Sequence, residues 1–384
     1  NYPQNKPKKM KITLGLALIF CSMGLAHGQT SKKSYNLLVG SYTNTEKTNG
    51  IAVYNFDANT GEASLRSKVT TVQNPSFLTI SNDRKNVYAV SEVADGKVNA
   101  FSFNSKSGEL QYLNSVSSGG NGPCYVSVDE KKQYVFAANY GGGSLSAIKI
   151  NKDGSLSNQI QTIQQTGSGV NQSRQSKPHV HSVVLSPDDR FLFAADLGTD
   201  KVNIYRFNAT AERPLAPAKM PFATVEPGGG PRHLSFHPNG KYAYLVLEME
   251  AAVAVFDYHN GELKSKQSIS MLSPDFKGKV GAADIHISPD GKFLYTTNRG
   301  EANDIIVCAI AKDGRLKYAG RHSGSINNPR NFAIDPTGKF VLIANQNTND
   351  IVIFKRNSTT GLLTETAQKI TVDKPVCVKF VEAD

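Results

Sequence analysis

The chain repeats one short pattern of strands and turns seven times between Tyr35 and its C-terminus. Each unit holds an apolar strand, a polar turn, a second apolar strand that ends in small or polar residues, a third strand and a turn before a leucine. These leucines are Leu65, Leu110, Leu156, Leu215, Leu263, Leu316 and Leu363. The resulting period of roughly 45 to 60 residues is that of one four-stranded β-propeller blade.

Turn chemistry and apolar runs support the strand prediction. The first turn of the unit reads Ser-Pro-Asp-Gly-Lys at Ser288–Lys292 and varies only slightly at His237–Lys241. Pro presets φ, Asp caps its own backbone and Gly takes a positive φ, as hairpin turns require. The runs that follow such turns, for example Phe191–Ala194 and Phe340–Ile343, are continuously apolar, which predicts burial on both faces. Helical periodicity is absent after residue 28.

The two ends of the repeat region predict how the ring closes. The first unit begins at Tyr35–Val39 without a leading strand, and the last segment, Lys374–Phe380, is a strand without a blade of its own. Pairing the two leaves no sheet edge open between the ends of the chain. We therefore predict an all-β fold with a single seven-bladed β-propeller, four antiparallel strands per blade, and a C-terminal strand that closes the first blade.

The N-terminal segment has the pattern of an export signal. A basic start at Lys8–Lys11 precedes the short apolar run Ile12–Phe20, and small residues follow at Ala26–Gly28. We therefore predict a leader and signal peptide over residues 1–28 and the propeller domain over residues 29–384. The mature protein is expected to be exported, periplasmic or secreted, without a membrane span.

Charge and cysteines exclude several function classes. The formal net charge of +11 includes four lysines before residue 28, and the remaining lysines lie mostly in hairpin tips. Such a distribution is typical of a solvated surface and not of a nucleic-acid stripe, although it favours anionic small molecules. Cys124, Cys308 and Cys377 have no metal-type spacing and are expected to be buried thiols. We predict no cofactor and no transition metal, leave open a calcium ion in the channel, and expect a monomer.

Aligning the units predicts which side chains line the central channel. Five residues before each turn stand Ser76, Cys124, His181, Arg232, Ala283 and Arg330. Just after the second strand stand Glu92, Tyr140, Leu197, Glu248, Arg299 and Gln346, with Tyr42 in the first unit, and Asn139 and Asn298 are among the residues that precede them. Because the inner strands of a propeller surround its channel, these positions converge at one mouth, where ligand sites form.

The histidines divide into two groups. His179 and His181 lie on one face of an extended segment, and His181 shares its register position with Arg232. His233 alternates away from Arg232 and His237 occupies a turn position, and these two and His286 are interpreted as structural.

The charged positions suggest a site for an anion. Arg232, Arg299 and Arg330 are suited to bind a carboxylate, phosphate or oxyanion. Glu248 is either a general base or a salt-bridge partner of these arginines, and its protonation state cannot be deduced from the sequence because burial and guanidinium groups act on it in opposite directions. The remaining predicted ligand contacts are His179, Asn139, Tyr140, Asn298, Gln346 and Glu92.

Several strings resemble the seven-bladed lactonase family, which includes the propeller type of 6-phosphogluconolactonase and carboxymuconate-cyclising enzymes. They are Pro178–Ser182, Ala195–Val202, Gly229–His233, Leu247–Glu248, Ser288–Lys292 and Thr297–Gly300, and the resemblance covers residues 35–384. It implies a metal-independent catalytic site made of His181 (or His179), Arg232, Glu248 and Arg299. The export signal is a departure, because phosphosugars are cytosolic, so the implied substrate includes unphosphorylated lactones.

The leading hypothesis is a lactone hydrolase of the 6-phosphogluconolactonase type. Arginines would bind an anionic lactone and polarise its carbonyl, and Glu248 or His181 would take a proton from the attacking water. A lactonising isomerase of the muconate type is the alternative within this fold. A non-catalytic exported propeller that binds a partner is the alternative from another class.

Overall fold

The computed structural model describes residues 3–4, 33–43 and 50–383. In this part of the chain there are 28 strands and no helix, and so no helix with the length and hydropathy needed to cross a membrane. The strands belong to one compact unit, Lys33–Asp384. Apart from residues 3 and 4, the predicted leader and signal peptide lies outside the described residues.

The strands form seven four-stranded antiparallel sheets, and each sheet is one blade. From the inner to the outer strand, the first blade is β28 (Pro375–Glu382), β1 (Ser34–Ser41), β2 (Ile51–Asp57) and β3 (Ala63–Val69). The second is β4 (Leu78–Ile80), β5 (Asn86–Ser91), β6 (Lys97–Asn104) and β7 (Glu109–Ser117). The third is β8 (Pro123–Val128), β9 (Tyr134–Asn139), β10 (Ser144–Ile150) and β11 (Leu156–Gln164).

The other four blades follow the same order. The fourth is β12 (Val180–Leu185), β13 (Phe191–Asp196), β14 (Lys201–Phe207) and β15 (Leu215–Thr224). The fifth is β16 (Pro231–Phe236), β17 (Tyr242–Leu247), β18 (Ala252–His259) and β19 (Glu262–Ser270). The sixth is β20 (Val280–Ile287), β21 (Phe293–Gly300), β22 (Asp304–Ile310) and β23 (Leu316–His322). The seventh is β24 (Pro329–Ile334), β25 (Phe340–Asn345), β26 (Asp350–Arg356) and β27 (Leu363–Thr371).

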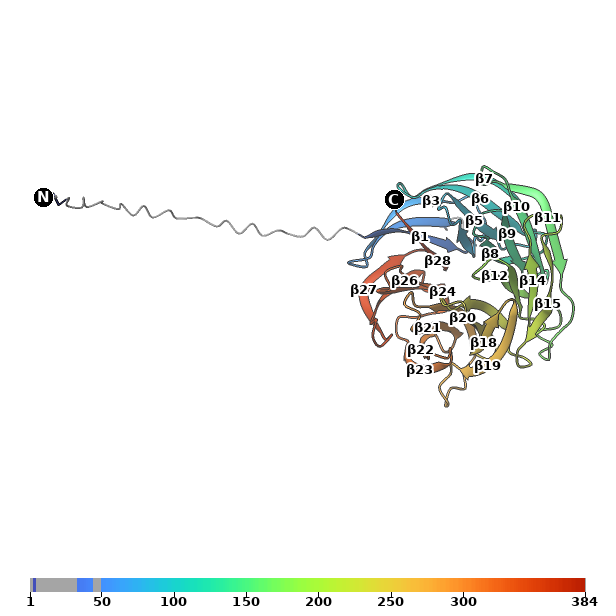
Figure 1. Ribbon diagram of the computed structural model, residues 1–384. Coiled ribbons are helices and arrows are strands. Elements are labelled where there is room, and N and C mark those ends of the chain that lie inside the picture. Colours follow the sequence, from blue (N-terminus) through green and yellow to red (C-terminus); the bar gives the residue numbers. More distant parts are fainter. Residues whose placement is uncertain (1–2, 5–32, 44–49, 384) are drawn as a thin grey trace. The chain divides into compact units, whose positions relative to one another are not determined.

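The blades form a closed ring. Each inner strand contacts the inner strands of the blades before and after it, including β24 with β28 and β28 with β4. Figure 1 shows the blades around a common centre, with β28 (red) beside β1 (blue). The prediction of an all-β, seven-bladed propeller is therefore confirmed.

The first blade is assembled from both ends of the repeat region, as predicted. Strand β28 pairs with β1 in antiparallel register, with Leu38 opposite Lys379 and Gly40 opposite Cys377. A side chain is not tolerated at Gly40, because a Cβ atom there would lie 2.3 Å from the carbonyl oxygen of Pro75 in the following connection. The closing strand thus gives β1 a partner on both sides and removes a free sheet edge.

The core lies within and between the blades. Strands β5, β9, β13 and β25 are buried at every residue, as their apolar sequences predict. Tyrosines on second strands add polar contacts between neighbouring blades: the Tyr88, Tyr244 and Tyr295 hydroxyls donate to the carbonyl oxygens of Gly154, Gly314 and Gly361. Because these phenols are buried, their hydrogen bonds avoid the cost of an unpaired hydroxyl.

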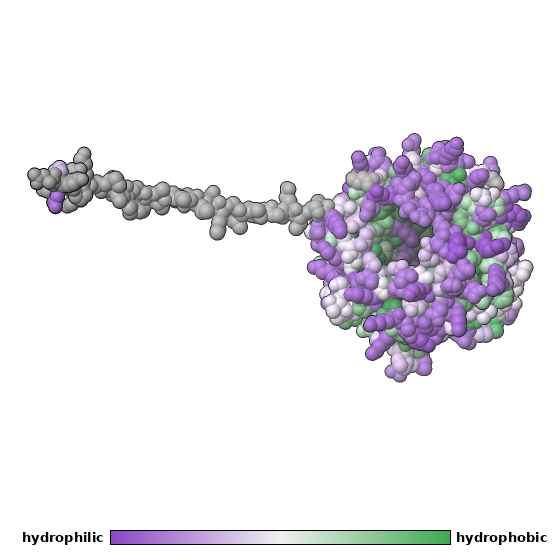
Figure 2. Space-filling model, in the orientation of Figure 1, coloured by the Kyte–Doolittle hydropathy of each residue, from purple (hydrophilic) through white to green (hydrophobic). Residues whose placement is uncertain are grey.

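The strand directions give the channel two different mouths. Inner strands begin, and second strands end, at the same mouth, which we call the charged mouth. The polar hairpin turns lie at the opposite mouth, which we call the turn mouth, and Gly240, Gly291 and Gly338 have positive φ angles of 68°, 70° and 71° in them, as predicted. Figure 2 shows a hollow at the centre of one face of the ring, with hydrophilic side chains around it.

Replacing Leu38 with Ala tests the closure of the first blade. Leu38 is fully buried in β1 and belongs to the core shared by the first two blades, so Leu38→Ala should lower the free energy of unfolding by about 2–5 kcal/mol. The matched control is Leu65→Ala in the same blade, where the side chain is 48% exposed and the expected change is below about 0.5 kcal/mol. Urea unfolding measures both, and equal losses would contradict this account of the first blade.

Candidate active site

Glu248 lies at the centre of a cluster of arginines at the charged mouth. It directly follows β17 and is 6% exposed. Its Oε2 atom lies 3.0 Å from Nε of Arg232 and 3.1 Å from Nη2 of Arg299. Its Oε1 atom lies 2.6 Å from Nη2 of Arg174. The structure therefore brings together three of the four residues predicted as catalytic, in a group with Arg174 that we call the arginine pit.

The inner strands have β-bulges at the positions that carry these side chains. In β12 the register against β13 shifts between Val180 and Ser182, which leaves His181 without a partner residue. In β16 the shift between Pro231 and Leu234 contains both Arg232 and His233. A bulge bends its strand and redirects side chains, and bulges are frequent next to active sites. Here they turn consecutive side chains toward the channel.

The bulge in β16 corrects the interpretation of His233. Simple alternation sends His233 away from Arg232, yet Nη1 of Arg232 lies 3.3 Å from Nε2 of His233. A second bulge, in β20, contains Asp284, whose Oδ1 atom lies 2.7 Å from Nδ1 of His233. His286 also belongs to this group, because its Nε2 atom is 2.9 Å from Oδ2 of Asp284. His233 and His286 thus belong to a buried polar cluster that sequence periodicity did not reveal.

His181, the fourth predicted catalytic residue, lies beside Glu248. The side chain is 6% exposed, and its Nε2 atom is 3.9 Å from Oε2 of Glu248. Its Nδ1 atom is 3.6 Å from Sγ of the buried thiol Cys124. Burial, followed by the positive charge of Arg232, lowers the pKa of His181 well below its ordinary value. The imidazole is therefore neutral at physiological pH.

Tyr140 and His179 lie on the rim beside His181. The rings of Tyr140 and His179 stack with centroids 4.5 Å apart, and Nδ1 of His179 is 2.9 Å from the carbonyl oxygen of Tyr140. The Tyr140 ring meets the His181 ring edge-on at 5.3 Å. His179 is thus held by Tyr140 and not by Glu248.

Arg330, Tyr42 and Glu92 form a second charged group at the same mouth. The Tyr42 hydroxyl donates to Oε2 of Glu92 over 3.0 Å, and the Arg330 guanidinium lies 5.4 Å from the centre of the Tyr42 ring. Nη2 of Arg330 is 3.6 Å from Glu92, beyond hydrogen-bond range, and the Arg330 side chain is 15% exposed. Within the described residues it donates no hydrogen bond that would satisfy this largely buried guanidinium.

Three predicted ligand contacts have other partners. Asn139 and Asn298 are fully buried, and their amide groups donate to the next strand of their own blades, to Ser144 and Asp304 respectively. These amide groups fasten the strand ends, and the structure does not bring the two asparagines into the arginine pit. Gln346 stays partly exposed at the rim and accepts a hydrogen bond from Asn328, not from the charged group.

Arg174 is the pit residue that the repeat register missed. It lies in the connection between β11 and β12, which spans residues 165–179 and has no counterpart in the alignment of the units. Its neighbour Gln175 is fully buried and donates to Oδ1 of Asp200 over 2.8 Å, which anchors the connection. The unusual length of this connection at the charged mouth was the only sequence signal.

The pit carries more positive than negative charge. Glu248 has a pKa lowered to about 2, because Arg299, Arg232 and Arg174 outweigh the opposing effect of burial. Burial, together with Arg299 and Arg330, lowers the pKa of Arg232 to about 10, so it stays protonated at neutral pH. Two carboxylates, Glu248 and Glu92, thus face four guanidinium groups, on Arg174, Arg232, Arg299 and Arg330.

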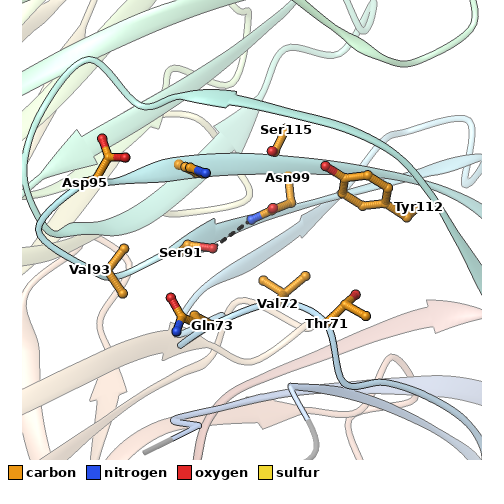
Figure 3. Close-up of a pocket in the computed structure, with 10 residues that line it drawn as sticks. Thr71, Val72, Gln73, Ser91, Val93, Asp95, Asn99, Tyr112 and Ser115 are labelled. Carbon is orange, nitrogen blue, oxygen red and sulfur yellow. Dashed lines mark hydrogen bonds between the residues drawn. The ribbon is translucent and has the colours of Figure 1, made fainter.

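The cavity described next has fewer charged side chains than the arginine pit. A cavity of about 610 Å³ lies between β5–β7 and the segment Thr71–Gln73, and its charged lining residues are one acid, Asp95, and one base, Lys97. Figure 3 shows its polar side chains, with Asn99 donating to Ser91. No group of three or more histidine, cysteine, aspartate or glutamate side chains suited to a metal ion occurs among the described residues.

Comparisons with known proteins identify a family and similar structures. Residues 36–380 match the protein family described as Lactonase, 7-bladed beta-propeller. The chain is 38% identical to a 6-phosphogluconolactonase of Formosa agariphila over 88% of this chain and 97% of that one. It is 34% identical to the 6-phosphogluconolactonase of Bacillus subtilis over 89% and 97%. The solved structure of the Pseudomonas aeruginosa periplasmic gluconolactonase matches with a TM-score of 0.86 and 38% identity over 91% of this chain and all of that one.

The ion pairs of Glu248 make stability depend on pH. Its folded-state pKa of about 2 is below the ordinary value of 4.5, so its contribution is present above about pH 4.5 and is lost as the pH falls toward 2. Glu248→Gln should therefore be less stable than the wild type at pH 7, and the gap should narrow between pH 5 and pH 3 in urea unfolding. The exposed control Glu212→Gln should show no such gap. A gap for Glu248→Gln that is independent of pH would contradict the geometry of the pit.

Proposed function

The chain belongs to the lactonase family of seven-bladed β-propellers, and from this premise we propose that it hydrolyses an anionic sugar lactone in the arginine pit. One observation carries the proposal: four guanidinium groups converge on two carboxylates at one mouth of the channel. Buried guanidinium groups in excess repel one another, and a bound anion relieves that repulsion. The guanidinium N–H groups can donate hydrogen bonds both to the ester carbonyl and to a remote anionic group of the substrate.

In the proposed reaction a water oxygen forms a bond to the lactone carbonyl carbon while Glu248 takes one proton from that water. Arg232 and Arg299 donate to the carbonyl oxygen as it becomes an oxyanion. When the ring C–O bond breaks, Glu248 returns the proton to the leaving oxygen, which becomes a hydroxyl group. The second water proton leaves as the new carboxylic acid ionises, so the product is an open hydroxy acid.

The low pKa of Glu248 limits its basicity before the substrate binds. Its carboxylate is stabilised by Arg174, Arg232 and Arg299, and a carboxylate held in this way is a weak base. An anionic substrate shares these guanidinium groups and draws positive charge away from Glu248, which raises the pKa of Glu248 toward its ordinary range. Neutral His181, 3.9 Å away, lies in position to orient the water or accept the proton in its place.

Arg330 is the residue we propose for the remote anionic group. It lies against Tyr42, and its guanidinium makes no hydrogen bond within the described residues. A phosphate or carboxylate would satisfy its parallel N–H groups. Relatives are named for both a phosphorylated and a plain gluconolactone, so 6-phosphogluconolactone and glucono-lactone are the first substrates to compare. Export of the mature protein remains part of this proposal.

An assay of lactone opening tests the function. The opening is measured through the acid that it releases, at a pH where spontaneous hydrolysis is slow. The wild type should accelerate the opening of at least one of these lactones, and Glu248→Gln should lower kcat by about 100-fold or more because the proton acceptor is lost. Arg190→Gln is the control, since Arg190 lies in a turn at the other mouth with its side chain 61% exposed. Circular dichroism checks the fold of each variant.

Two outcomes of this assay would overturn the proposal. One is a wild type that opens no sugar lactone faster than buffer does. The other is a folded Glu248→Gln variant with unchanged kcat. Formation of a lactone from an unsaturated dicarboxylate by the wild type would instead support the lactonising isomerase, and retained binding of a macromolecule without turnover would support a binding propeller.

The role of Arg330 has a separate signature. Arg330→Gln should raise KM for 6-phosphogluconolactone by about tenfold or more, because the guanidinium–phosphate pair is lost, and should change KM for neutral glucono-lactone by less than about twofold. Steady-state kinetics with the two substrates measures the difference. An equal change in both KM values would rule out recognition of the remote anion by Arg330.

A further inference from the structure

We infer that Asp284, acting through His233, positions Arg232 for the reaction in the pit. This inference rests on the proposed lactone hydrolysis and adds two positioning residues to it. Neither residue was predicted as part of the site. Three groups in contact make up this arrangement: the carboxylate of Asp284, the imidazole of His233 and the guanidinium of Arg232.

The first link is the fixed carboxylate of Asp284, which is 2% exposed. His233 and His286 donate to its two oxygens over 2.7 Å and 2.9 Å, and the backbone N–H of Phe332 donates over 3.3 Å. The side-chain amide of Asn331 also donates to it. These donors lie on the inner strands of three successive blades, β16, β20 and β24. A buried carboxylate with four donors has a single orientation.

The second link is the tautomer of His233. Because Asp284 accepts the proton on Nδ1, a neutral His233 has its lone pair on Nε2. The ring is neutral, since burial and the charge of Arg232 lower the pKa of His233 to about 3. Edge-on contacts with the rings of Tyr125 and His181, at 5.2 Å and 5.3 Å, hold its plane. The imidazole ring is therefore held in one orientation beside Arg232.

The third link is the guanidinium of Arg232, which is 1% exposed. Nη1 of Arg232 lies 3.3 Å from Nε2 and 3.4 Å from Nδ1 of His233, so it rests against the imidazole ring, and it donates to the carbonyl oxygen of Ala283. Its Nε atom donates to Glu248 over 3.0 Å. Its Nη2 atom makes no hydrogen bond within the described residues. His233 and Asp284 thus fix the rotation of the guanidinium, and Nη2 is left to bind a substrate oxygen.

The second histidine on the same carboxylate provides a matched control. His286 bonds to Asp284 and lines the same cavity as His233 does, but it lies against the ring of Phe332. It makes no recorded contact with Arg232. If the substitutions act only by weakening the hydrogen bonds of Asp284, kcat should fall in the variants of both histidines. If His233 positions Arg232, kcat should fall only in the His233 variant.

The test compares His233→Leu, His233→Gln and His286→Gln in steady-state lactone hydrolysis. His233→Leu keeps the bulk but removes both polar contacts, so kcat should fall about 10- to 100-fold with KM changed by less than about threefold. In His233→Gln the amide group donates to Asp284 and accepts from Arg232, so kcat should recover to within about fivefold of the wild type. His286→Gln should stay within about twofold.

Crystal structures of the same variants give a result that does not depend on activity. In His233→Leu the Arg232 guanidinium should rotate away from Ala283, and in His233→Gln it should keep its place. The inference is overturned if the guanidinium is unmoved in a folded His233→Leu variant, or if His233→Leu and His286→Gln lower kcat equally. If the wild type opens no lactone, the proposed function fails, and the crystal structures alone decide whether His233 positions Arg232.

Discussion

The pairing of β28 with β1 is the constraint on which the rest of the structure depends. It joins the two ends of the repeat region and makes all seven blades part of one ring. In a closed ring the inner strands begin at the same mouth, so residues far apart in sequence meet there. Glu92 and Arg330 belong to the second and seventh blades and still lie 3.6 Å apart. The charged mouth exists because the ring is closed.

The charge in this mouth is unfavourable for folding alone. Arg232 is almost fully buried, and it shares one carboxylate with Arg299 and Arg174. Buried charges are costly unless they are paired and hydrogen-bonded, and here the guanidinium groups outnumber the carboxylates. Second strands of the surrounding blades, such as β5, β9, β13 and β25, are buried at every residue and hydrogen-bonded, so they supply the stability that this cluster does not. Such an arrangement is expected where a site is shaped for an anion.

Errors in the sequence-based predictions had local causes. His233 was assigned away from Arg232 because strand side chains alternate, and a bulge interrupts that alternation. Arg174 was missed because it lies in a connection outside the repeat. Each error arose where one residue departs from the regular pattern of its unit.

The sequence by itself determined the number of blades, their strand order, the closing role of Lys374–Phe380 and the register that brings His181, Arg232, Glu248 and Arg299 to one mouth. These properties follow from periodic patterns, and a repeated pattern carries its geometry with it. Only the tertiary structure decided that Arg174 reaches Glu248, that Asp284 holds His233 against Arg232, and that Arg330 is left without a hydrogen bond among the described residues. Those contacts depend on bulges and on side chains from neighbouring blades, which no single repeat encodes.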